Sequence, residues 1–226
     1  MSIRSPEQVA LLTDYDTGSA YSAAYYTFYA NIRFNWNNEQ RIHTLLLAPP
    51  AHYAAQATVA ANTAIVAARS GMPTILVDAD LRAPGLEQRF GLEKQAGLSD
   101  LLTAPAASIT TVKVQEHLRE TFVVGLRLLS AGTAVEGPPL LLSPNLQVVI
   151  QQISLLLSQA ENAKGVVIFN SPPVVAGPDA SLVGALVEQT ILTIGKGRTT
   201  RLQAKQAQEQ LNRAHANLVG IVMLDV

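Results

Sequence analysis

The sequence contains no cysteine, which excludes disulfides, thiol chemistry and cysteine-based metal sites. Charged residues are also scarce: they make up 15% of the 226 residues, whereas 48% are hydrophobic. This composition excludes a disordered chain and indicates a buried core. The net charge of −1 predicts no overall attraction to nucleic acid or to an anionic membrane, so we expect no nucleic-acid partner.

Long apolar runs are missing as well. The sequence has no stretch of about 18 uninterrupted apolar residues, which predicts no membrane-spanning helix. Residues 1–17 lack the apolar segment of a signal peptide, and we expect them to form an arm or loop. Together with the absence of cysteine, these features favour a cytoplasmic protein.

Apolar strands alternate with helices along most of the chain. The patterns predict strands near residues 44–48, 74–78, 122–129, 166–170, 190–194 and 218–224, and helices near 54–70, 97–103, 144–163, 180–187 and 200–214. The runs around Leu76 and Ile168 are apolar throughout, which is typical of strands covered on both faces. We therefore predict an α/β fold with a mostly parallel sheet sandwiched by helices, and a surface connection over residues 103–112.

An additional helix is predicted before this core, from about residue 18 to 34. Apolar and aromatic side chains recur there every three or four residues, at Tyr21, Tyr25, Phe28 and Ile32. Tyr26 and Tyr29 lie on an adjacent face. We assign residues 1–40 to an N-terminal helical arm with an interface helix, and residues 41–226 to the main domain.

The loop after the first strand stands where a phosphate-binding loop would be expected. Such a loop needs glycines, a lysine and a Ser or Thr hydroxyl that binds magnesium. Residues 50–58 contain no glycine and no lysine, and Thr58 supplies the one hydroxyl of an aliphatic side chain. The amide groups at the helix start could still attract an anion. We favour the alternative, a helix start with Tyr53 packed over it.

Polar side chains also end two of the predicted strands. Asp78 and Asp80 could position magnesium or activate a hydroxyl; alternatively they pair with Arg82 or cap the next segment. Asn170 ends another strand and lacks the negative charge that a magnesium ligand would supply there. The four histidines show no ligand spacing, and we interpret them as surface or packing residues: His43, His52, His117 and His215.

Four blocks of the sequence resemble the cytoplasmic kinase domain of bacterial tyrosine kinases (BY-kinases), members of the ParA/MinD-like P-loop superfamily. The blocks are NIRF (31–34), TVAANTAIVAARSGMPTILVDADLRAPGLEQRFGLEKQAGLSDLL (58–102), LLSAG…PPLLLSP (128–144) and SPPVVAGPDA (171–180). The resemblance implies a P-loop NTPase-like fold and a role in capsule or exopolysaccharide production. Active members bind Mg-ATP, form rings, phosphorylate a C-terminal tyrosine cluster and pair with a membrane chain-length regulator.

The sequence departs from this family at its functional positions. The family's Walker A loop falls on residues 53–57, with Gln56 at the lysine, and its Walker B aspartate falls on Asn170. Asp78 and Asp80 keep the second acidic motif. The resemblance thus defines a vestigial nucleotide site: His52, Tyr53, Ala55, Gln56, Ala57, Thr58, Asp78, Asp80, Asn170 and Leu224. The family's ring-contact motif falls on Ala23, Tyr26 and Tyr29, which defines a candidate interface: Ala23, Tyr25, Tyr26, Tyr29 and Arg33.

These departures predict a pseudokinase-like protein without catalytic residues or metal, in which Mg-ATP binding is lost or very weak. We expect it to bind a membrane chain-length regulator or an active BY-kinase relative, and so to modulate exopolysaccharide polymerisation or export at the inner face of the plasma membrane. One alternative is a residual ATPase or tyrosine autokinase with a non-standard phosphate loop. Another is a homo-oligomer built through the tyrosine-rich helix. Without nucleotide, we expect Arg82, or the Lys196/Arg198 loop, to turn inward and pair with the aspartates.

Overall fold

The computed structural model describes residues 11, 18–37, 39–53, 55–133, 140–159 and 164–224. A seven-stranded sheet with the order β3-β4-β2-β5-β1-β6-β7 forms the centre of this part of the chain. Its strands are β1 (Ile42–Ala48), β2 (Thr74–Asp78), β3 (Leu118–Glu120), β4 (Leu126–Leu129), β5 (Gly165–Asn170), β6 (Gln189–Gly195) and β7 (Leu218–Leu224). Neighbouring strands run parallel except β3 and β4, so the predicted mostly parallel sheet is confirmed.

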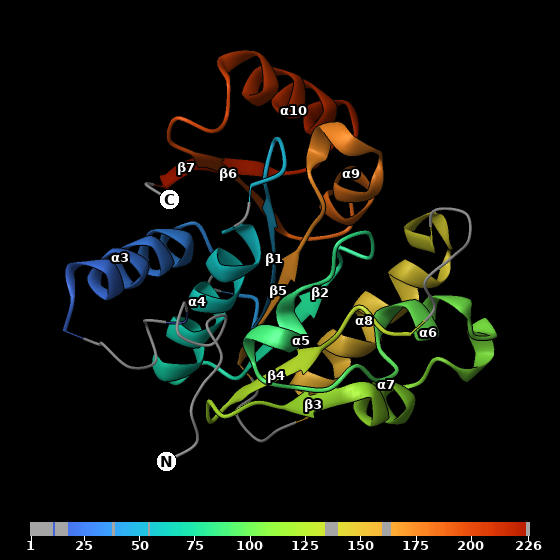
Figure 1. The fold of residues 1–226 in the computed structure, drawn as a ribbon. Helices are drawn as coiled ribbons and strands as arrows, with labels where there is room; N and C mark the ends of the chain where they lie inside the picture. Colours follow the sequence, from blue (N-terminus) through green and yellow to red (C-terminus); the bar gives the residue numbers. More distant parts are fainter. Residues whose placement is uncertain are drawn as a thin grey trace.

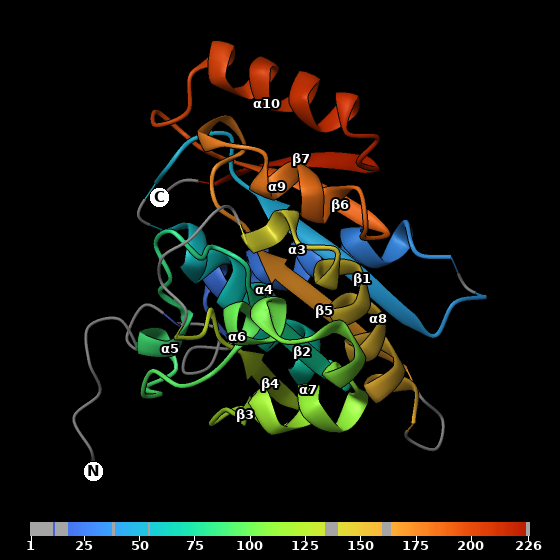
Figure 2. The same cartoon turned by 90° about the vertical axis from the view of Figure 1, so that its right-hand side faces the viewer.

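Helices cover both faces of the sheet, as Figures 1 and 2 show. They are α3 (Ala20–Phe34), α4 (Gln56–Arg69), α5 (Leu86–Arg89), α6 (Leu98–Thr103), α7 (Thr111–His117), α8 (Asn145–Ser158), α9 (Asp179–Gly184) and α10 (Arg201–Arg213). Among the described residues, no helix is both long and apolar enough to cross a membrane.

Each central strand contributes to two hydrophobic cores because successive side chains point to opposite faces. In β1, Leu45 and Leu47 join the core under α3 and α4, whereas Leu46 and Ala48 join the core under α8 and α9. The alanine-rich α4 is buried along nearly its whole length and lies between the sheet and α3. Its small side chains let α3 and the sheet approach it closely from both sides.

Three short elements differ from the sequence expectations. The strand predicted over 122–129 begins only at Leu126, because a turn at Gly125, with φ of +82°, folds the chain into a hairpin with β3. The stretch 103–112, expected to be a plain connection, contains a short 3₁₀ turn and the start of α7, where the Thr110 hydroxyl accepts a hydrogen bond from the Lys113 amide. Helix α5 was not predicted. The end of the helix predicted over 144–163, and residues 1–17 except Leu11, lie outside the described residues.

Candidate functional site

The sheet brings three predicted site residues together at its carboxyl edge. Strand β5 lies between β1 and β2, and Asn170 at its end is paired in register with Asp78 at the end of β2. Helix α4 begins at Gln56, after the loop that follows β1. This is the edge at which open α/β sheets bind ligands.

These side chains form one continuous hydrogen-bonded network. The Gln56 side-chain amide donates to Asn170 Oδ1 at 3.3 Å and to the carbonyl oxygen of Ser171. The Asn170 side-chain amide in turn donates to Asp78 Oδ1 at 2.9 Å. Gln56, Asn170 and Asp78 are all buried. We call this chain of contacts the 56–170–78 network; it occupies the place where the resemblance puts lysine, the magnesium site and phosphate.

Within the described part of the chain, the groups that hold Asp78 are amide donors and not cations. Its Oδ2 accepts hydrogen bonds from the backbone amides of Gly85 and Leu86, each at 3.1 Å. Burial raises the pKa of Asp78 to about 6, although the hydrogen bonds from Asn170, Leu86 and Gly85 oppose this shift. The neighbouring Asp80 carboxylate adds to it.

The predicted inward pairing of Arg82 is wrong. The Arg82 guanidinium donates from Nε to Asp179 Oδ2 at 2.8 Å, and the Lys196/Arg198 loop is exposed. Asp80 accepts instead from the backbone amide of Ala83 at 3.1 Å. Burial raises the pKa of Asp80, against the hydrogen bonds from the backbones of Ala83 and Arg82. The short segment after β2 therefore wraps its amides around both carboxylates.

The described residues of the loop, which exclude residue 54, do not form a phosphate cradle. The backbone N–H of Gln56 donates a hydrogen bond to the Tyr53 carbonyl oxygen at 3.3 Å, so it is directed away from the loop's interior. The Tyr53 side chain is buried. Thr58, also buried, accepts a hydrogen bond from Arg89 Nε at 3.0 Å. Arg89 also donates to the carbonyl of Gly85, so it joins α4 to the segment around Asp78. Sequence reasoning missed Arg89, and no motif marks it.

The remaining predicted site residues are dispersed or peripheral. His52 is exposed, and its proximity to Asp80 slightly opposes the rise in the pKa of that carboxyl. Ala55 precedes α4 without a side-chain cap, and Ala57 is partly exposed in the first turn. Leu224 lies at the end of the edge strand β7, separated from β5 by β1 and β6. Among the described residues, no cluster of three or more His, Asp or Glu side chains could hold a metal ion.

The candidate interface on α3 needs correction. Tyr25 and Tyr29 are only 4% and 2% exposed, because they pack in the core between α3 and α4. The Tyr21 hydroxyl lies 3.4 Å from that of Tyr25 and accepts a hydrogen bond from the Asn62 amide at 3.2 Å. Burial, and then the contact with Tyr21, raises the pKa of Tyr25. Of the candidate interface residues, Ala23 and Arg33 are exposed and Tyr26 is partly exposed.

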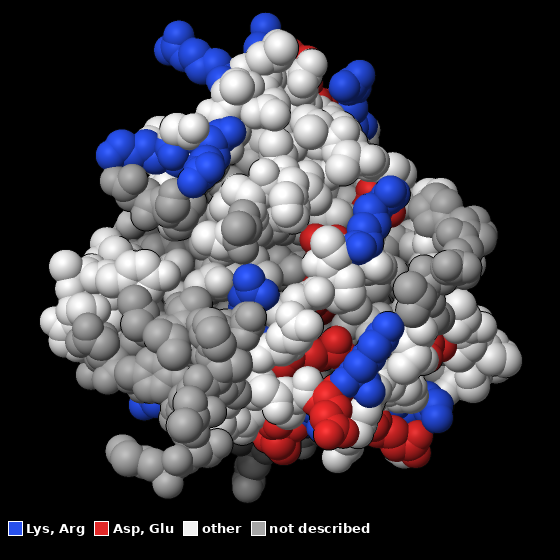
Figure 3. All heavy atoms as spheres, in the orientation of Figure 1, with Lys and Arg blue, Asp and Glu red and all other residues white. Residues whose placement is uncertain are grey.

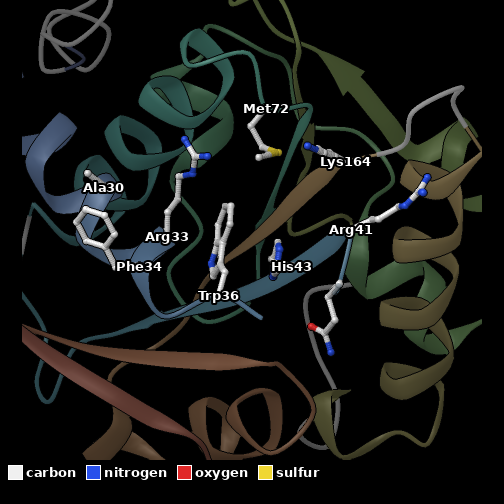
Figure 4. Close-up of a pocket in the computed structure, with 9 residues that line it drawn as sticks. Ala30, Arg33, Phe34, Trp36, Arg41, His43, Met72 and Lys164 are labelled. Atoms are coloured by element: carbon white, nitrogen blue, oxygen red, sulfur yellow. The ribbon is translucent and has the colours of Figure 1, made fainter. Parts of the chain in front are cut away.

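A cavity of about 390 Å³ lies at the opposite, amino edge of β1 (Figure 4). Trp36 stands at its centre, stacked on His43 with ring centroids 4.1 Å apart. Arg33 lies over the Trp36 ring at 5.8 Å from its centroid, and Lys164 reaches in from the other side. The cavity is thus aromatic and cationic, and it is separate from the 56–170–78 network.

Comparison with known proteins finds that the chain is similar to bacterial tyrosine-protein kinases, although no family model matches it. It is 29% identical over 202 residues to the tyrosine-protein kinase YwqD of Bacillus subtilis, which covers 89% of this chain and 80% of YwqD. It is 30% identical over 189 residues to the tyrosine-protein kinase ptk of Acinetobacter johnsonii. That match covers 82% of this chain but only 24% of the longer kinase.

Solved structures support the same relationship. The tyrosine kinase domain of BceF matches with a TM-score of 0.77 and 26% identity, covering 99% of this chain and 90% of that domain. The septum site-determining protein MinD of Pyrococcus horikoshii, solved with Mg-ADP, matches with a TM-score of 0.62, covering 80% of this chain and 70% of MinD. At 17% identity it shares the fold alone. The chain is therefore a homologue of the bacterial tyrosine-protein kinases, with the α/β fold of the ParA/MinD-like P-loop proteins.

Proposed function

We propose that this chain is a non-catalytic relative of the bacterial tyrosine kinases. In this proposal it binds a membrane chain-length regulator of polysaccharide export, or an active kinase relative, and modulates exopolysaccharide polymerisation or export without using ATP. The observation that carries the proposal is the 56–170–78 network. Side chains at positions that the resemblance assigns to nucleotide binding form hydrogen bonds with one another and with the Ser171 carbonyl.

The chemistry of phosphoryl transfer supports this reading. Transfer depends on positive charge at the transferring phosphate and on magnesium held by carboxylates. Gln56 is neutral, and its amide is already used by Asn170 and Ser171. Opening the network for Mg-ATP would leave buried polar groups without partners, each costing about 1–3 kcal/mol. No lysine in the loop offsets that cost.

Calorimetric titration of the purified chain with Mg-ATP and Mg-ADP tests the loss of nucleotide binding. We expect no binding at micromolar concentrations, with the B. subtilis kinase YwqD measured alongside as a positive control. Binding in the micromolar range by this chain would contradict the proposal. Thermal unfolding with and without each nucleotide gives an independent measurement, since a ligand that binds the folded state raises the unfolding temperature.

A residual enzyme is the second candidate function, because two buried carboxyl groups with raised pKa values are typical of catalytic sites. This candidate predicts phosphate release from ATP, and it predicts that Asp80→Asn changes the turnover. Absence of phosphate release, with and without a kinase partner, rejects it.

A partner contact can be tested separately from any catalytic activity. Self-association through α3 is tested by light scattering with residues that the structure leaves accessible. The paired change Ala23→Glu and Tyr26→Glu is suitable because neither side chain is fully buried. A monomeric wild-type chain favours a different protein as partner. A wild-type oligomer that the double variant dissociates favours pairing through α3. An oligomer that the variant leaves intact excludes this face.

A further inference from the structure

The chain's charge is distributed unevenly. Residues 195–226 contain five Lys or Arg and two Asp or Glu, a net charge of +3. Residues 1–194 contain eleven Lys or Arg and fifteen Asp or Glu, a net charge of −4. The overall charge of −1 is therefore the sum of a basic C-terminal part and an acidic remainder of the chain. Local fields of this kind govern association even when the net charge is small.

The basic side chains are exposed on one end of the molecule. They lie on the loop after β6 and along α10: Lys196, Arg198, Arg201, Lys205 and Arg213. In Figure 3 blue spheres stand along the upper end, where Figure 1 places α10, and most of the red spheres lie lower. Among the described residues, Lys205 pairs with Glu209 at 3.8 Å, whereas Arg198 and Arg201 form no ion pair.

Large apolar side chains are exposed beside these cations. Leu202, in the first turn of α10, is 65% exposed, and Ile221 and Met223 on β7 are 53% and 64% exposed. Ile221 is in register with Leu192, which packs in the same core as residues of α10. Because side chains two residues apart share a face, Ile221 and Met223 lie on the face of β7 that faces α10. Strand β7 is also an edge of the sheet.

We propose that this surface binds directly to an anionic lipid membrane. The α10–β7 surface, as we define it, consists of Lys196, Arg198, Arg201, Leu202, Ile221 and Met223. Its cations contact lipid phosphates, and its apolar side chains enter the boundary between headgroups and acyl chains. Nucleic acid would also attract the cations, but it gains nothing from three exposed apolar side chains. The inference goes beyond the proposed function, in which a protein partner brings the chain to the membrane, and it does not depend on the state of the nucleotide site.

Co-sedimentation of the full chain with lipid vesicles tests the charge requirement. We expect binding to vesicles of equal parts phosphatidylglycerol and phosphatidylcholine, no binding to pure phosphatidylcholine, and weaker binding as added salt screens the charges. Arg198→Glu with Arg201→Glu should lower the partition coefficient by at least about 30-fold, since each basic residue near an anionic surface contributes about a factor of five. The control, Arg41→Glu with Lys94→Glu, makes the same change in net charge at exposed sites elsewhere and should bind like the wild type.

Insertion of Leu202 is tested by fluorescence. Because the chain has no cysteine, Leu202→Cys carries one environment-sensitive dye, and Lys94→Cys serves as the labelled control. Anionic vesicles should shift the emission of the dye at position 202 to the blue and leave that at 94 unchanged. Failure of the wild type to bind anionic vesicles overturns the proposal, as does equal loss in both charge variants. Binding to a DNA duplex in the absence of vesicle binding also overturns it, and assigns the surface to polyanions instead.

Discussion

The buried carboxyl group of Asp78 makes the stability of the fold depend on pH. Its pKa is raised from 3.8 to about 6, so the folded state holds this proton more tightly than the unfolded state. Its contribution to the free energy of unfolding is therefore fully present below about pH 4 and is lost as the pH rises through 6. The shift of about two pKa units corresponds to about 3 kcal/mol.

The substitution Asp78→Asn isolates this contribution. Asparagine keeps the shape of the side chain but only one of its two acceptor oxygens. In one orientation its NH₂ group faces the Asn170 amide, and in the other it faces the backbone amides of Gly85 and Leu86, so donor meets donor in both. That conflict adds a penalty that does not vary with pH. We expect the variant, compared with the wild type, to gain about 2–3 kcal/mol of relative stability between pH 4 and pH 7.5. Part of this gain in stability comes from the loss of repulsion between the Asp78 and Asp80 carboxylates.

Urea unfolding at a series of pH values, followed by circular dichroism, measures the difference between the two proteins. Ser171→Ala is the matched control, because Ser171 is buried beside the network and does not titrate. Its difference from the wild type should stay constant across the series. If the difference for Asp78→Asn is also constant, the pKa of Asp78 is the same in the folded and unfolded states. The amide donors would then fully offset the effect of burial, and our account of the site would be refuted.

Three other substitutions test the packing around the site and the core. Gln56→Ala should lower the free energy of unfolding by about 2 kcal/mol in urea titrations, because it leaves the buried Ser171 carbonyl without this donor; no change would mean that water replaces the amide. Gly97→Ala should cost about 2–4 kcal/mol, since a Cβ there would lie 2.3 Å from the Ser130 carbonyl oxygen, and a variant with wild-type stability would show that this contact relaxes freely. Tyr29→Phe should be neutral or stabilise by up to about 1 kcal/mol, because the buried Tyr29 hydroxyl has no hydrogen-bond partner among the described residues; a marked loss of stability would reveal a partner.

Much of the fold could be predicted because its strongest signals are local. The apolar runs around Leu76 and Ile168 indicated strands covered on both faces, and both lie at the centre of the sheet. Strand β3 and helix α5 were missed, since three or four residues carry too little periodicity to be recognised. Strand β3 exists because Leu118 and Arg119 pair with β4, a contact that the sequence pattern does not contain.

The sequence predicted the parts of the site whose positions follow from the ends of the strands. It did not predict which side chains pair with one another. Asp78 and Asn170 meet because parallel strands end at the same edge. Arg82 was expected to pair with its sequence neighbours, but it selects Asp179, which is 97 residues away. Helical spacing likewise identified an aromatic face on α3. It could not tell that Tyr25 and Tyr29 pack inward against α4, because periodicity does not say which face finds a partner.

The two replacements at Gln56 and Asn170 make physical sense only together. By resemblance, they stand at a lysine and an aspartate, so the pair removes one positive and one negative charge from a buried site. If only the lysine were replaced, a second carboxylate would lie beside Asp78 without its cation. If only the aspartate were replaced, a buried ammonium group would lack one of its carboxylates. Unpaired buried charges of this kind cost several kcal/mol. Two neutral amides instead bond to each other and continue the chain to Asp78, whose charge is met by backbone N–H groups. In this arrangement Gln56 and Asn170 carry no charge that would need a counter-ion, and the Asp78 carboxyl accepts hydrogen bonds from the protein itself.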